Sequence, residues 1–262
     1  MHPTTTTPTP APDNKFHLQD FAREGELTIF GGRPAMGRTS VALNIALSLQ
    51  EQTGGKAIYF DLDCMHSHID RRLRTITGEI VEPTPLFERT QPSALPLRLW
   101  DARNATVSQI VACSRKAAAQ TPIAAIFVDW LQLLFENAPT SDGPVHIARD
   151  LVDLRLLAQE LGVPVIGLAS LPRELEARND KRPRLTDFAV GGLPDTACDR
   201  FVAIYRHYYY HTDGCPHCQT DTEAHPSEPT ELLVWDGDKT ERTTHILRFD
   251  AHSGKVDWGP ES

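Results

Sequence analysis

Short apolar runs alternate with longer segments of helical periodicity along most of the chain. Residues 39–50 repeat apolar side chains along a helix, and the pair Gly54-Gly55 that follows favours a helix end. Residues 123–128 are apolar throughout, as expected of a strand in the middle of a parallel sheet. The predicted strands are 27–30, 56–61, 97–100, 123–128, 163–168, 201–205, 232–235, 244–249 and 256–258, and the predicted helices are 39–50, 68–76, 107–119 and 147–161.

This order of elements predicts an α/β fold. Repeated strand-then-helix units typically build a mostly parallel central sheet with helices on both faces. The closing strands, two of which flank a turn at 250–254, predict antiparallel strands at one edge of the sheet.

A glycine-rich turn joins the first predicted strand to the first predicted helix. It fits the phosphate-loop pattern G-x-x-x-x-G-K-[ST], except that Arg38 replaces the lysine. Glycines let backbone N–H groups face phosphate oxygens, and the helix start attracts anions. A plain glycine turn without a ligand is the alternative, but the flanking strand and long helix favour phosphate binding. The expected nucleotide-binding residues are Gly32, Arg33, Pro34, Ala35, Met36, Gly37, Arg38, Thr39 and Ser40, and Thr39 is also expected to bind Mg²⁺ through its hydroxyl.

Arg38 keeps the positive charge of the expected lysine but changes its shape. A guanidinium is broad and planar, whereas a lysine ammonium is a compact point charge. Phosphoryl transfer depends mostly on positioning, so we expect nucleotide binding to survive this change better than catalysis does.

Charge and composition narrow the function classes. The chain has 26 basic and 35 acidic residues, a net charge of −9, so DNA contact would require a local patch or an oligomeric channel. The longest apolar runs, 123–128 and 163–170, are far shorter than the ~20 residues that span a bilayer. With no signal pattern and five cysteines that do not resemble a disulfide framework, we expect a cytoplasmic protein. Residues 1–15 are rich in Thr and Pro and predict a disordered tail before one domain over 16–262.

Several segments together resemble the motor domain of DnaB-like hexameric replicative helicases. The run R-P-A-M-G at 33–37 followed by A-L-N-I-A at 42–46 is similar to the family's R-P-x-M-G-K-T and A-L-N-I-A. The run F-V-D-W-L-Q-L at 127–133 is similar to its strand end I-D-Y-L-Q-L, and residues 157–165, 168–171 and 173–178 follow its later motifs. The resemblance extends in order from about residue 21 to 258. It implies a RecA-like P-loop NTPase fold that binds ATP and Mg²⁺ and forms hexameric rings around single-stranded DNA.

The resemblance assigns roles unevenly. Asp129 matches the Walker B aspartate that supports Mg²⁺, and Gln132 follows it in the nucleotide-binding segment. Asp63 stands in place of the glutamate that activates water, one methylene shorter. Ser170 replaces a glutamine that senses the γ-phosphate, and Asp236 begins a D-G-D run where the family has a K-x-R pair reaching the neighbouring subunit, although Lys239 and Arg242 lie close by. The segment 188–194, expected to be a DNA-facing loop, has no basic residue.

A polar stretch between two predicted strands holds a separate cluster of metal-ligating residue types. Cys215 and Cys218 form a C-x-x-C pair, and His211 and His225 complete a candidate Cys₂His₂ zinc set. Free thiols in a loop are the alternative, since one C-x-x-C is weaker than two. The nearby run 206–211, rich in aromatic residues, is interpreted either as a base-stacking surface or as a strand end with one buried face.

Two functions follow from these patterns. One is a helicase-like ATPase acting in DNA replication, with Arg38, Asp63 and Asp129 as its catalytic residues, single-stranded DNA as a partner and a homo-oligomeric state. The other is a catalytically inactive relative that engages a replicative helicase as adaptor, loader or inhibitor, which the substitutions at four catalytic positions favour.

Overall fold

The computed structural model describes residues 17–63, 66–78, 97–136, 144–190, 193, 198–210, 228–237, 241–250 and 252–258. These residues form a nine-stranded sheet of order β3-β2-β4-β5-β1-β6-β7-β8-β9. The six strands from β3 to β6 in that order are parallel, and β7, β8 and β9 are antiparallel. The strands are β1 (Leu27–Gly32), β2 (Lys56–Asp61), β3 (Arg98–Asp101), β4 (Ile123–Asp129), β5 (Val165–Ser170), β6 (Arg200–Arg206), β7 (Glu228–Asp236), β8 (Thr243–Phe249) and β9 (Val256–Asp257).

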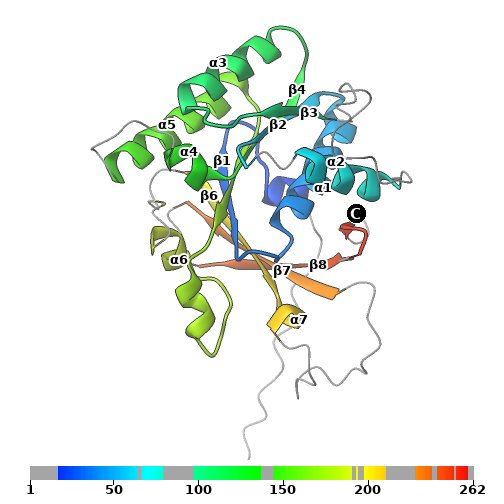
Figure 1. The fold of residues 1–262 in the computed structure, drawn as a ribbon, viewed down its shortest axis with the longest axis vertical. Helices are drawn as coiled ribbons and strands as arrows, with labels where there is room; N and C mark the ends of the chain where they lie inside the picture. Colours follow the sequence, from blue (N-terminus) through cyan, green and yellow to red (C-terminus); the bar gives the residue numbers. More distant parts are fainter. Residues whose placement is uncertain are drawn as a thin grey trace, which may run out of the picture.

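Helices cover both faces of the sheet, as predicted (Figure 1). One face carries α1 (Arg38–Thr53) and α2 (His66–Thr77). The other carries α3 (Val107–Ala118), α4 (Leu131–Glu136), α5 (Pro144–Leu161) and α6 (Leu185–Val190). The short helices η1 (Leu18–Asp20), η2 (Arg173–Ala177) and α7 (His207–Tyr210) add to these layers, and Leu18 of η1 and Leu175 of η2 are buried in the cores. No helix in the described ranges is long and apolar enough to cross a membrane.

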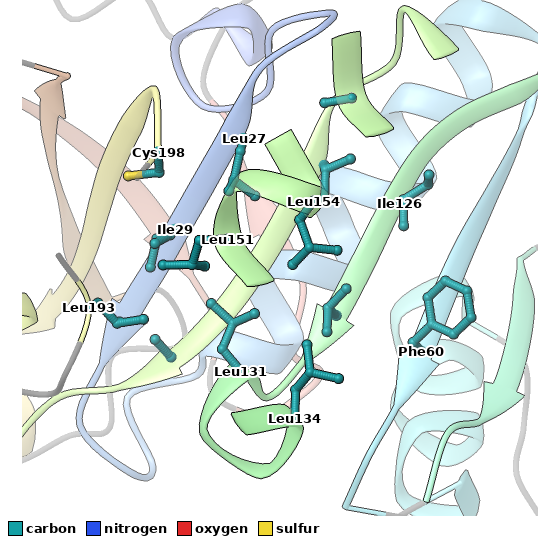
Figure 2. Packing of buried hydrophobic residues seen from close by; sticks show 14 of the residues in the cluster. Leu27, Ile29, Phe60, Ile126, Leu131, Leu134, Leu151, Leu154, Leu193 and Cys198 are labelled. Atoms are coloured by element: carbon teal, nitrogen blue, oxygen red, sulfur yellow. The ribbon is translucent and has the colours of Figure 1, made fainter. Parts of the chain in front are cut away.

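The alternation of side chains along each strand creates two apolar cores, one on each face. Figure 2 shows the core beneath α4 and α5, where Leu131, Leu151 and Leu154 pack over Leu27 and Ile126. Cys198 lies at the margin of this core and is 4% exposed, so it packs as a small apolar group.

Three segments differ from the predictions. The strand predicted over 123–128 is present as β4 and ends at Asp129, but residues 131–136, for which no element is predicted, form α4, because Leu131 and Leu134 are spaced to reach the core from one helix face. Within the predicted loop 188–194, residues up to 190 belong to α6, and Phe188 is 1% exposed against the core. After Arg206 the predicted strand end turns into α7, which leaves Tyr209 exposed.

The parallel strands bring their carboxyl ends to one edge of the sheet. Asp61 lies opposite Asp129, and Gly32 lies opposite Ser170. Ligands of open α/β sheets bind at this edge, outside the carboxyl ends of the strands. The loop from β1 into α1 lies at the same edge, so segments far apart in the sequence converge there (Figure 1).

Candidate nucleotide site

The loop between β1 and α1 is held in shape by close packing. Gly37, the residue before α1, has a φ of 91°, a conformation that favours glycine. A Cβ at Gly37 would lie 3.0 Å from the Phe249 ring, and one at Gly32 would lie 2.5 Å from Ile204 Cγ2. Met36 is 2% exposed and anchors the loop in the core. The loop backbone is therefore tightly constrained at both glycines.

Arg33 fastens the loop to the segment after β5. Its Nε donates a hydrogen bond of 2.9 Å to Glu176 Oε1, and its Nη1 donates one of 2.7 Å to the Leu171 carbonyl oxygen. Pro34 and Ala35 are exposed. Arg33 thus ties the loop to η2 and to the residue after β5, and both of these hydrogen bonds come from its guanidinium.

Thr39 and Asp129 meet at the head of the loop. The Thr39 hydroxyl donates a hydrogen bond of 3.1 Å to Asp129 Oδ2, and the Tyr59 hydroxyl donates one of 2.6 Å to the same oxygen. Burial raises the pKa of Asp129, while the Tyr59 hydrogen bond and the charge of Arg38 oppose that rise. Burial and the neighbouring Asp129 charge raise the pKa of Tyr59 well above its usual value, so its hydroxyl remains protonated.

Arg38 extends toward the same carboxylate. Its guanidinium lies 5.8 Å from the centre of the Trp130 ring, and burial lowers its pKa although the charge of Asp129 opposes this. Its Nη1 is buried without a hydrogen-bond partner among the described residues. A buried donor of this kind is costly unless a ligand satisfies it.

Three further predicted site residues are Asp63, Ser40 and Gln132. Asp63 is exposed after the end of β2, and its charge contributes to the raised pKa of Asp129. Ser40 is buried, and its Oγ accepts a hydrogen bond of 2.7 Å from Arg72 on α2. The Gln132 side chain makes two hydrogen bonds to the Ser170 backbone. Its Nε2 donates to the Ser170 carbonyl oxygen at 2.9 Å, and its Oε1 accepts from the Ser170 amide nitrogen at 3.1 Å. The Gln132 side chain thus links α4 to the end of β5.

Asp236 is engaged in the body of the domain. Its Oδ1 accepts a hydrogen bond of 2.8 Å from Arg200 Nε, and Arg200 is 1% exposed and also pairs with Glu26 at 3.2 Å. Arg242 is exposed, while Asp238 and Lys239 lie outside the described residues. The predicted charge inversion at Asp236 therefore coincides with an ion pair to a buried arginine.

The predicted zinc ligands His211, Cys215, Cys218 and His225 lie outside the described residues. Within the described ranges, no group of three or more His, Cys, Asp or Glu side chains is arranged to hold a metal ion.

Tyr59 and Trp130 are the two side chains at this centre that the sequence did not single out. Tyr59 lies inside an apolar strand, where a tyrosine usually signals only packing. Its position one strand away from Asp129 is the signal that would have found it, because β2 and β4 are neighbours and Tyr59 lies opposite Phe127.

The centre has the chemistry to hold a phosphate and a divalent cation. Arg38 supplies a buried cationic donor without a partner among the described residues, and Thr39 and Asp129 supply oxygen ligands of the kind that Mg²⁺ prefers. At Gly32 and Gly37 the neighbouring side chains leave no space for a Cβ atom, so the loop backbone at these positions carries no side chain. These residues therefore fit a nucleotide phosphate with its metal ion.

Comparison with known proteins identifies the family to which the chain is similar. Residues 18–255 match the family described as the DnaB-like helicase C terminal domain. The chain is 30% identical over 257 residues to the replicative DNA helicase DnaB of Rickettsia bellii, covering 88% of this chain and 50% of that protein. It is 31% identical over 202 residues to the DnaB of Helicobacter pylori strain J99, covering 71% of this chain and 41% of that one. The chain thus spans about half the length of these curated relatives.

Solved structures show the same fold. A DnaB-like replicative helicase, described with its interactions with primase, superposes with a TM-score of 0.71 at 22% identity, covering 93% of this chain and 62% of that one. A second solved structure, described as an ATPase domain, superposes with a TM-score of 0.70 at 23% identity, covering 89% of this chain and 84% of that one. These similarities confirm the predicted α/β, RecA-like architecture.

Proposed function

The chain belongs to the family of DnaB-like helicase C terminal domains, and from that premise we propose that it binds ATP with Mg²⁺ at the loop between β1 and α1. The proposed motor-type domain covers 16–262. We further propose that it acts in DNA replication or a neighbouring process, as a member of an oligomeric ring or beside a replicative helicase.

The meeting of Thr39, Asp129 and Arg38 carries this proposal. A hydroxyl at the start of a helix and a carboxylate at the end of a buried strand share a hydrogen bond, and a buried guanidinium with an unsatisfied donor lies near them. A phosphate would satisfy that guanidinium, and loop N–H groups at the α1 start would add further donors.

Each residue has a proposed role in this site. Arg38 pairs with phosphate oxygens, Thr39 and Asp129 hold the metal ion, and Gly32 and Gly37 let the backbone approach the phosphates. Bound Mg²⁺ supplies charge neutralisation on the phosphate oxygens. Asp63 is the proposed base for an attacking water, and its charge already acts on Asp129.

We propose that hydrolysis is weak relative to binding. Arg38 spreads its charge over a plane where lysine concentrates it, and Asp63 is shorter than glutamate. Asp236 pairs with Arg200 where the resemblance implied a cation reaching a neighbouring subunit. Each departure affects positioning, which dominates phosphoryl transfer.

A second candidate function is favoured by the Asp236–Arg200 pair. A subunit whose trans-acting cation is replaced by an internally paired carboxylate is suited to bind a replicative helicase without working as a motor. In this hypothesis the domain is an adaptor, loader or inhibitor, and nucleotide binding is a structural or regulatory feature.

Turnover of ATP by the purified chain, with and without single-stranded DNA, separates the two functions. DNA-stimulated hydrolysis supports the motor. Saturable nucleotide binding without turnover, together with co-elution of a replicative helicase, supports the adaptor. A chain that neither binds nucleotide nor associates with a helicase would contradict both.

A further inference from the structure

The Tyr59 hydroxyl occupies a position that the proposed function leaves unexplained. It donates a hydrogen bond of 2.6 Å to Asp129 Oδ2, the oxygen that also accepts from Thr39 at 3.1 Å. In the part of the chain that the structure describes, both hydrogen bonds to this carboxylate end on the same oxygen. The second oxygen, Oδ1, therefore keeps its acceptor capacity.

The sheet fixes where this hydroxyl lies. Tyr59 is fully buried on β2, and its ring stacks on Phe127 of β4 with centroids 5.7 Å apart and planes 14° apart. Phe127 precedes Asp129 by two residues and so points to the same face of the sheet. The packed Tyr59 ring therefore fixes the position of its hydroxyl beside the Asp129 carboxylate.

The two hydroxyls differ in what a ligand would do to them. Thr39 lies in the first turn of α1 and is itself a proposed metal ligand, so its hydroxyl is shared when the site is filled. Tyr59 is not a proposed metal ligand, so its hydroxyl is not shared with the metal ion when the site is filled. Partners that hold a ligating carboxylate in this way commonly set metal affinity.

We propose that Tyr59 is a positioning residue for the divalent cation: its hydroxyl fixes the Asp129 carboxylate through Oδ2 and directs Oδ1 toward the metal site. This inference rests on the proposed nucleotide site and assigns Tyr59 no contact with nucleotide.

The test is the Mg²⁺ dependence of nucleotide affinity in a Tyr59→Phe variant of the full chain. A fluorescent ADP analogue is titrated at a series of Mg²⁺ concentrations and again in EDTA. The Mg²⁺ concentration that gives half of the metal-dependent gain in affinity is expected to rise about 10-fold. Affinity in EDTA is expected to be unchanged, because the phenyl ring preserves the packing on Phe127.

A matched control is Tyr205→Phe. Tyr205 is buried on β6, and its hydroxyl lies 3.3 Å from His207 Nδ1, so the variant also removes a partly buried hydroxyl interaction. Its Mg²⁺ dependence is expected to equal that of the wild type.

The possible results distinguish failure of the role proposed for Tyr59 from failure of the proposed nucleotide site. An unchanged Mg²⁺ requirement in Tyr59→Phe, or an equal loss of affinity with Mg²⁺ and in EDTA, would overturn the role of Tyr59 while nucleotide binding by the wild type stands. Failure of the wild-type chain to bind the analogue under any condition would overturn the proposed function and this inference with it.

Discussion

The Thr39 hydroxyl donates a hydrogen bond to Asp129 Oδ2 across 3.1 Å, joining the first turn of α1 to the end of β4. The two residues are separated by 90 positions in the chain and meet because β1 and β4 both flank β5 in the parallel sheet. Replacing Thr39 with Val keeps the shape of the side chain and removes the hydroxyl. We expect the affinity for Mg²⁺-nucleotide to fall roughly 10- to 100-fold. Equilibrium titration with a fluorescent nucleotide measures this, and Thr39→Ser, which keeps the hydroxyl, should retain most of the affinity.

Restoring lysine at position 38 should favour catalysis over binding. Arg38 has a buried Nη1 without a partner among the described residues and lies near the Trp130 ring, which a smaller ammonium would contact less. We expect Arg38→Lys to raise kcat for ATP about 10-fold or more, since misplacement at a reacting centre is worth up to about 100-fold. ADP affinity should change little. Steady-state turnover measures the effect, and a kcat equal to or below that of the wild type would show that Arg38 is not the cause of weak hydrolysis.

Two glycines with a left-handed backbone conformation allow the effect of backbone strain to be separated from the effect of a steric clash. Gly37 has a φ of 91° and Gly54 a φ of 69°, but a Cβ on Gly37 would lie 3.0 Å from Phe249 whereas one on Gly54 would meet nothing within 4 Å. Gly54→Ala should cost about 1–2 kcal/mol of unfolding free energy, the backbone strain alone. Gly37→Ala should cost more and also abolish nucleotide binding. Urea denaturation with a binding assay tests both, and equal stability losses would argue against the packing of Phe249 on the loop.

Removing the carboxylate of Asp236 should destabilise the domain. Arg200 is 1% exposed, while the Asp236 side chain is 37% exposed, so water weakens but does not replace the interaction. We expect Asp236→Asn to lower the free energy of unfolding by about 1–3 kcal/mol, because Glu26 still partly compensates Arg200. Glu241→Gln, at an exposed position, serves as the control and should change stability very little. A variant as stable as the wild type would show that the Asp236–Arg200 pair does not stabilise the domain.

The fold is largely predictable from the sequence because its signals are local. Apolar runs such as 123–128 and the glycine turn before α1 specify strands and the loop without long-range information. The sequence does not predict α4, because a short apolar stretch after a strand does not by itself indicate a helix that packs on the core, and the packing of Leu131 and Leu134 decides it.

The site is predictable in part for a similar reason. Thr39 and Asp129 belong to local motifs, so the sequence identifies both, and the structure brings them together. Tyr59 has no motif, and its contact with Asp129 exists only through the pairing of β2 with β4. The use of Gln132 to bridge α4 and β5 likewise depends on the position of Ser170, which no local pattern specifies.

Calorimetric titration of the wild-type chain with ATPγS in the presence of Mg²⁺ is the decisive test of the proposed nucleotide site. We expect saturable binding at one site per chain, displaced by ADP and weakened at least about 10-fold in Thr39→Val. Absence of saturable binding, or equal affinity in the wild type and the Thr39→Val variant, would contradict the assignment of the β1–α1 loop as a nucleotide site.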